Sequence, residues 1–73
     1  MEEGKKYYLG DGVNYFVYRR DKYNPETIRA DLFNMKDEIS DKMLVKGGII
    51  NANYSHKDVI NYFEFRISNF GKH

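Results

Sequence analysis

The architecture of this chain depends on residues 55–70, which read SHKDVINYFEFRISNF. Most of the later residues are aromatic or β-branched, and such residues favour β-strands. Successive side chains of a strand point to opposite sides, so Phe63, Phe65 and Ile67 would share one side of a sheet. We therefore expect a strand over residues 59–70, paired in a hairpin with residues 49–54, with residues 55–58 as the connection.

The same segment also carries the features of a helix. Ser55 and Asp58 have the spacing of a capping box, and Gly71 suits the position just past a helix end. A C-terminal helix over residues 56–70 is the alternative to the strand. Its apolar stripe would consist of Ile60, Phe63, Ile67 and Phe70.

A hairpin is predicted at the start of the chain. Residues 5–10 and 13–20 are rich in aromatic and β-branched residues, as strands usually are. Between them, Gly10-Asp11-Gly12 supplies residues that tolerate the positive φ angles of a tight turn.

A helix is predicted for the middle of the chain. Asn24 suits the N-cap, Pro25 suits the first helical position, and Gly47-Gly48 would end the helix. Asp31 would lie on the solvated side of this helix. Apolar residues recur at spacings of four, three, four and four, which is the stripe of an amphipathic helix: Ile28, Leu32, Met35, Ile39 and Met43.

These elements define a small α+β protein. We expect one domain over residues 1–73, with a four-stranded antiparallel sheet and one helix in the order ββαββ. With the C-terminal segment helical, the order becomes ββα(β)α. The chain has no cysteine, so packing and hydrogen bonds must stabilise it without disulfides.

A single helix can cover only one face of such a sheet, so the second face should meet water. We expect Phe63, Phe65 and Ile67 to face the helix together with Leu9 and Val17. Tyr and Arg are enriched in binding surfaces, and several of them fall on the other face. The predicted partner-binding residues on that face are Tyr8, Phe16, Tyr18, Arg20, Tyr62, Glu64 and Arg66.

No catalytic, cofactor-binding or metal-binding site is predicted. His56 and His73 are the two histidines, and zinc sites need several His or Cys ligands. Ser55, His56 and Asp58 are neighbours in sequence, whereas the members of a catalytic triad converge from separate elements. His56 is expected to be a solvated loop residue, and the chain is not expected to be an enzyme.

The charge argues against bulk nucleic-acid binding. Twelve Lys and Arg residues against eleven Asp and Glu residues give a formal charge of +1. We expect a protein-binding module that occupies a surface of another protein, with a homodimer as a second possibility. The alternative is a single-stranded nucleic-acid-binding protein that stacks bases on Tyr and Phe and contacts phosphates with Arg and Lys.

Size and composition extend this expectation. The abundance of Asn, Ile, Lys and Tyr is typical of AT-rich genomes, which suggests an accessory or inhibitor protein of a phage or mobile element. No apolar run is long enough for a membrane span, so no membrane partner is expected. A cytoplasmic location fits the lack of cysteine and of a targeting segment.

Overall fold

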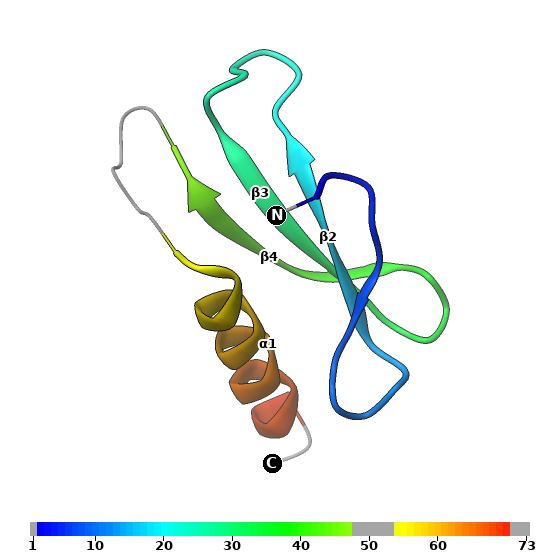
Figure 1. Ribbon diagram of the computed structural model, residues 1–73. Coiled ribbons are helices and arrows are strands. Elements are labelled where there is room, and N and C mark those ends of the chain that lie inside the picture. Colours follow the sequence, from blue (N-terminus) through cyan, green and yellow to red (C-terminus); the bar gives the residue numbers. More distant parts are fainter. Residues whose placement is uncertain (1, 48–53, 71–73) are drawn as a thin grey trace.

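The computed structural model describes residues 2–47 and 54–70, which contain four strands and one helix. In chain order the elements are β1 (Tyr7–Tyr8), β2 (Tyr15–Arg20), β3 (Ile28–Phe33), β4 (Ile39–Lys46) and α1 (His56–Phe70). The strands form one antiparallel sheet in the order β1-β2-β3-β4, and α1 follows them (Figure 1). This confirms a small α+β protein with a four-stranded antiparallel sheet and one helix. The observed order is ββββα.

The N-terminal hairpin is confirmed, with a shorter first strand than expected. The N–H of Leu9 donates to the carbonyl of Asn14 at 2.9 Å, which closes the turn. Gly12 adopts a φ of 70°, a left-handed conformation that glycine adopts at little cost. The Asp11 carboxylate accepts the N–H of Val13 at 2.9 Å, so this turn is fixed by its own side chain.

The prediction of a central helix was wrong, because that part of the chain forms the β3–β4 hairpin. Asn34 organises the turn between the two strands. Its carbonyl accepts the N–H of Asp37 at 2.9 Å, and its side-chain oxygen accepts the N–H groups of Lys36 and Glu38. Asp37 has a φ of 58°, the left-handed residue that three-residue hairpin loops require.

The residues that resembled a helix start form a single turn instead. The N–H of Thr27 donates to the carbonyl of Asn24 at 2.9 Å, and Pro25 lies second in that turn. Asn followed by Pro suits a β-turn as well as it suits a helix N-terminus, so the local pattern does not distinguish them. Met35 of the expected apolar stripe lies in the next turn and is 75% exposed.

At the C-terminal end, the helix alternative is confirmed and the strand prediction was wrong. The Asp58 carboxylate accepts the N–H of Ser55 at 3.0 Å, and the Ser55 hydroxyl lies 3.3 Å from the N–H of Asp58. This reciprocal pair is the predicted capping box, and it lowers the pKa of Asp58 through the hydrogen bonds from Ser55. The predicted stop at Gly71 and nearly all of the predicted strand over residues 49–54 lie outside the described residues.

The core lies between α1 and one face of the sheet. The Phe63 ring of α1 lies 5.6 Å from the Phe16 ring of β2, measured between centroids. Phe16 and Tyr18 are 0% and 1% exposed, although both were expected on the water-facing side. Val17, expected against the helix, points the other way. Alternation puts either the two rings or Val17 under the helix, and the two rings bury far more apolar area.

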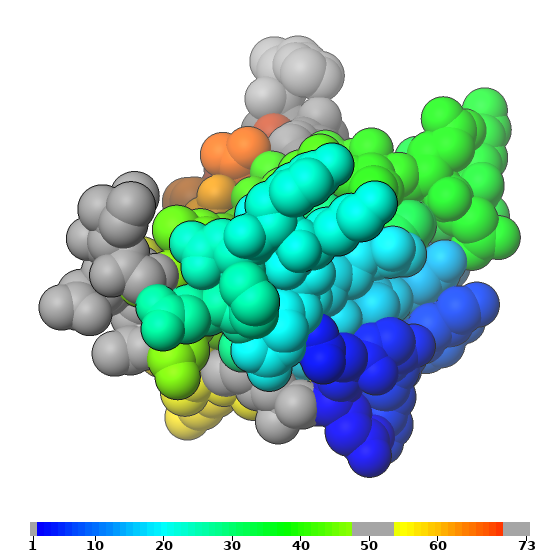
Figure 2. Space-filling view, turned by 90° about the horizontal axis from the view of Figure 1, so that it is seen from above, coloured from blue at the N-terminus to red at the C-terminus, as the bar shows by residue number. Residues whose placement is uncertain are grey.

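The N-terminal segment covers the outer edge of β2 beyond the short β1. Glu3 forms a bridge with Tyr18, and the N–H of Gly4 donates to the Tyr18 carbonyl at 3.1 Å. Figure 2 shows this segment in blue beside the cyan part of the chain that contains β2. The segment therefore occupies backbone groups of β2 that would otherwise form an open sheet edge.

Replacement of Ser55 by Ala should lower the free energy of unfolding by about 1 kcal/mol, because the helix loses its N-cap hydroxyl. Ser68→Ala is the matched control, since the Ser68 hydroxyl bonds only the Phe65 carbonyl of its own helix among the described residues. Urea unfolding followed by circular dichroism measures both. Equal stability of the Ser55→Ala variant and the wild type would contradict the capping role.

Candidate functional site

The sheet face opposite α1 carries no second layer of helix or strand among the described residues (Figure 1). Strand register places its members opposite one another, so that Tyr15 faces Phe33, Val17 faces Asp31 and Arg19 faces Arg29. Alternation along the strands puts these six on the side away from the core. We call this surface the open face and define it as Tyr8, Tyr15, Val17, Arg19, Arg29, Asp31, Phe33 and Lys42.

A ladder of three rings crosses the open face. The Tyr8 and Tyr15 ring centroids lie 5.3 Å apart, and the Tyr15 and Phe33 rings stack at 5.1 Å with an interplanar angle of 10°. Cross-strand aromatic pairs of this kind stabilise a sheet. Tyr15 and Phe33 are only 6% and 9% exposed, although the described structure has no second layer on this side.

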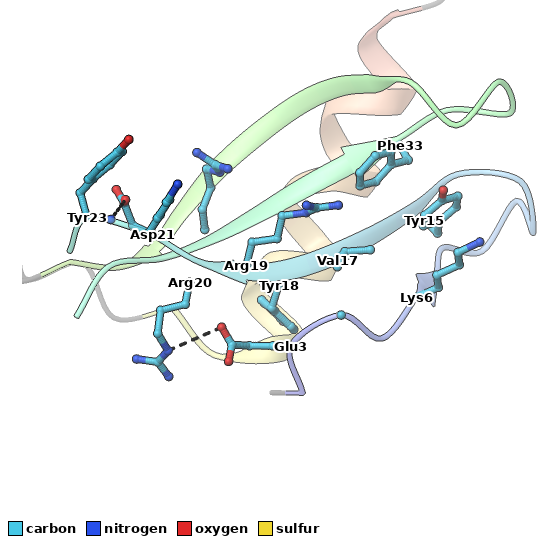
Figure 3. A pocket seen from close by; sticks show the side chains of 13 residues that line it. Glu3, Lys6, Tyr15, Val17, Tyr18, Arg19, Arg20, Asp21, Tyr23 and Phe33 are labelled. Carbon is cyan, nitrogen blue, oxygen red and sulfur yellow. Dashed lines mark hydrogen bonds and ion pairs between the residues drawn. The ribbon is translucent and has the colours of Figure 1, made fainter. Parts of the chain in front are cut away.

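Cationic side chains provide part of that cover. The Lys6 Nζ lies 4.9 Å from the centroid of the Tyr15 ring, and the Arg19 Cζ lies 5.7 Å from the centroid of the Phe33 ring. Figure 3 shows Lys6 beside Tyr15 and Arg19 reaching along the sheet toward Phe33. The open face therefore presents ammonium and guanidinium groups over a floor of aromatic carbon.

Asp31 organises the centre of this face. Its side chain is buried, yet Arg29 Nε approaches Oδ1 at 2.9 Å and Arg19 Nε approaches Oδ2 at 3.4 Å. Arg19 and Arg29 lie directly opposite each other on neighbouring strands, where like charges repel. The carboxylate between them offsets this repulsion and fixes both guanidinium groups. The sequence prediction missed this, because it placed Asp31 on a solvated helix face.

A groove of about 790 Å³ runs over the β2 part of the open face. Tyr15, Val17 and Phe33 contribute apolar lining, and the charged lining consists of five cations and two carboxylates. These are Lys6, Arg19, Arg20, Lys22 and Arg29 against Glu3 and Asp21. The Arg20 guanidinium is engaged by Glu3 at 3.5 Å and by the carbonyl of Pro25. The groove is therefore positive.

The structure places the seven predicted partner-binding residues in three different parts of the protein. Tyr8 is on the open face with a 59% exposed side chain, and Arg20 lines the groove. Phe16 and Tyr18 are buried in the core instead. The remaining three residues are on α1 rather than on a sheet face: Tyr62, Glu64 and Arg66.

Two of the predicted residues on α1 hold the helix against the sheet and its first turn. A Glu64 carboxylate oxygen accepts the N–H of Gly10 at 3.2 Å, and Arg66 Nε donates to the Asp41 carboxylate at 2.9 Å. The Asp41 carboxylate raises the pKa of the Arg66 guanidinium by this bond. These contacts position α1, so the described structure gives both residues a part in the fold.

His56 is half-buried at the start of α1 rather than solvated in a loop. Its Nδ1 lies 2.6 Å from the Tyr18 hydroxyl, and its ring centroid is 4.6 Å from that of Tyr7. Burial raises the pKa of Tyr18 to about 12, so this hydroxyl is neutral at physiological pH. The pair links the helix N-terminus to the sheet through a hydrogen bond.

No protein-family model, curated protein or solved structure matches this chain. Within residues 2–47 and 54–70, no cluster of three acidic, His or Cys side chains is placed to hold a metal ion. No helix of the described parts is long and apolar enough to cross a membrane. Any proposal about function therefore has to come from the surfaces themselves, and the open face is the most distinctive of them.

Asp31→Asn should lower the free energy of unfolding by roughly 1–3 kcal/mol, because both arginines lose a buried charged acceptor. Asp21→Asn is the control. Its carboxylate accepts the Tyr23 N–H at 2.8 Å in an exposed loop, so its stability should change by less than about 0.5 kcal/mol. Equal effects of the two substitutions in urea unfolding would show that Asp31 does not organise the open face.

Alkaline pH should weaken the fold through Tyr15. Its hydroxyl donates to the Asp37 carboxylate at 2.7 Å, and this bond is the main reason that its pKa is raised to about 12. The raised pKa contributes stability that is present below about pH 10 and is lost as the pH rises through about 12.

Asp37→Asn should reduce this loss, because a neutral acceptor no longer repels the phenolate. Urea unfolding at a series of alkaline pH values measures the loss of stability, and the ultraviolet absorbance of tyrosinate measures the ionisation of the tyrosines. An unchanged pH dependence in the Asp37→Asn variant would rule out this coupling.

Proposed function

We propose that this chain is a small non-catalytic binding protein that docks its open face on an acidic surface of a partner protein. The observation that carries the proposal is the pair of half-exposed guanidinium groups, Arg19 and Arg29, set beside an apolar floor. Arginine next to aromatic carbon is the composition most enriched at the energetic centres of protein interfaces. The positive groove complements carboxylates on the partner.

The burial of the Tyr15 and Phe33 rings on the open face favours a protein partner over a single-stranded nucleic acid. Stacking of bases needs accessible ring faces, whereas Tyr15 is almost fully buried and has Lys6 over its ring. Tyr8 and Tyr23 are exposed aromatic residues near the groove, and they are the feature that keeps nucleic acid as the second candidate.

The biological role follows from how such a protein would act. A chain of 73 residues that occupies a partner's surface fits an accessory or inhibitor protein, and the composition fits a phage or mobile element. A cytoplasmic location belongs to the same proposal. A homodimer through the open face is the competing arrangement. It would bring the cationic grooves of two copies together, and their like charges would repel unless each groove contacted carboxylates of the other copy.

Charge reversal at the rim of the groove tests the proposal. Lys6→Glu with Lys22→Glu changes two exposed groove cations without touching the Asp31 contacts. Lys36→Glu with Lys57→Glu makes the same charge change at exposed positions outside the groove lining. The partner is captured on immobilised wild-type chain, purified, and titrated with all three proteins by calorimetry.

The groove variant should bind the purified partner at least about tenfold more weakly than the wild type, and the control variant should bind it within about twofold. If both variants lose affinity for the partner equally, or if neither loses affinity, the proposed surface is contradicted. Fluorescence anisotropy with a labelled oligo-dT strand is the second arm. Tight binding of that strand with a steep negative dependence on salt would favour the nucleic-acid candidate instead.

A further inference from the structure

We infer that Arg19 and Arg29, aligned by Asp31, form a carboxylate-binding site for one Asp or Glu side chain of a partner segment. This inference rests on the proposed function and identifies the chemistry that the open face recognises. It assigns the site to two guanidinium groups and gives the buried carboxylate a positioning role.

The unused donors of the two arginines support this site. Each guanidinium carries five N–H donors in a planar fork. Asp31 accepts two of them from Arg29, at 2.9 and 3.5 Å, and it forms an ion pair with Arg19, whose Nε lies 3.4 Å from Oδ2. No other hydrogen bond joins either group to the described residues, and both side chains are half-exposed and line the groove. The free edges of the forks match the two oxygens of a carboxylate.

Asp31 makes this arrangement persistent. A flexible arginine loses side-chain entropy when it binds a ligand, and a contact that already holds its Nε reduces this loss. Because the Asp31 carboxylate is buried, it positions the two arginines and leaves the solvent-exposed side of each guanidinium group open to a ligand. Its effect on binding is therefore to fix the direction of the forks.

The charge at the two forks complements a carboxylate. The two arginines and Asp31 together leave a single net positive charge, which one carboxylate neutralises. Of the other cations in the groove lining, Arg20 is paired with Glu3, and Lys6 and Lys22 add to the positive charge along the groove. A phosphorylated side chain carries close to two negative charges and is the competing anion in the test.

The aromatic floor supports the site. Arg19 is packed over Phe33, which in turn stacks on Tyr15. Both rings are almost fully buried, so they hold the Arg19 side chain in place and the ligand contacts the guanidinium groups.

Three synthetic peptides and the ¹⁵N-labelled full chain test the inference. The peptides are a short segment of alternating Glu and Leu, its analogue with Gln in place of Glu, and its analogue with phosphoserine in place of Glu. The side-chain Nε–H signals of Arg19 and Arg29 report binding directly. The Nε–H signal of Arg66, which donates to Asp41 outside the groove lining, is the internal reference.

The Glu-Leu peptide should shift the Arg19 and Arg29 signals and leave Arg66 in place, and the Gln analogue should bind at least about tenfold more weakly. Arg29→Lys keeps the charge and removes the fork, so it should weaken binding about fivefold or more. Arg66→Lys, on α1 outside the groove lining, should bind as the wild type does. Circular dichroism establishes that both variants are folded.

Three outcomes with the peptides would overturn the inference: no binding of the Glu-Leu peptide at millimolar concentration, equal binding of the Gln analogue, or tighter binding of the phosphoserine analogue. A fourth is a change in the Arg19 and Arg29 signals when the protein alone is diluted, because a second copy of the chain would then occupy the site. If the peptides fail while the purified partner still distinguishes the Lys6/Lys22 variant from its control, the proposed function stands and this carboxylate site does not.

Discussion

The contact between α1 and one face of the sheet is the constraint on which the rest of the structure depends. Phe63 meets Phe16, and with Tyr18 and Val59 these residues form the centre of the core. One helix covers one face of a four-stranded sheet, so the choice of face decides which side chains are buried and which are presented. A shift of one residue in β2 would exchange the two sets.

The opposite face is stabilised by its own side chains in the absence of a second layer among the described residues. Its rings stack on one another across the strands, and Lys6 and Arg19 lie over them. Asp31 compensates the arginines that would otherwise repel each other. The same contacts that bury apolar area also orient the cations toward solvent, and this connects the stability of the face to the binding role that we propose for it.

The sequence predicted those elements whose determinants are local. Gly10-Asp11-Gly12 identifies the first turn because a tight turn needs residues that accept positive φ, and Asp11 bonds its own backbone there. The Ser55 and Asp58 pair indicated the helix alternative for residues 56–70, because a capping box is complete within four residues. The favoured strand prediction rested on β propensity and was wrong, because tertiary packing overrides such weak preferences.

The β3–β4 hairpin and the open face depend on contacts between distant residues, and the local pattern did not predict them. Asn24-Pro25 fits a helix start and a β-turn equally, and the pairing of Arg20 with Ile28 across β2 and β3 selects the turn. Asp31 looked like a surface acid because its two partners become neighbours only after β2 and β3 pair. The candidate site was predicted as a surface rich in Tyr and Arg, but most of the named residues belong to the core or to α1.

The side of the sheet that α1 covers is tested most directly by nuclear Overhauser effects from the Phe63 ring protons in the ¹³C-labelled protein. We expect cross-peaks to Phe16, whose ring centroid lies 5.6 Å away, and none to Tyr15 or Phe33, which belong to the open face. Cross-peaks from Phe63 to Tyr15 or Phe33 would place α1 on the other side of the sheet. They would contradict both the fold and the surface derived from it.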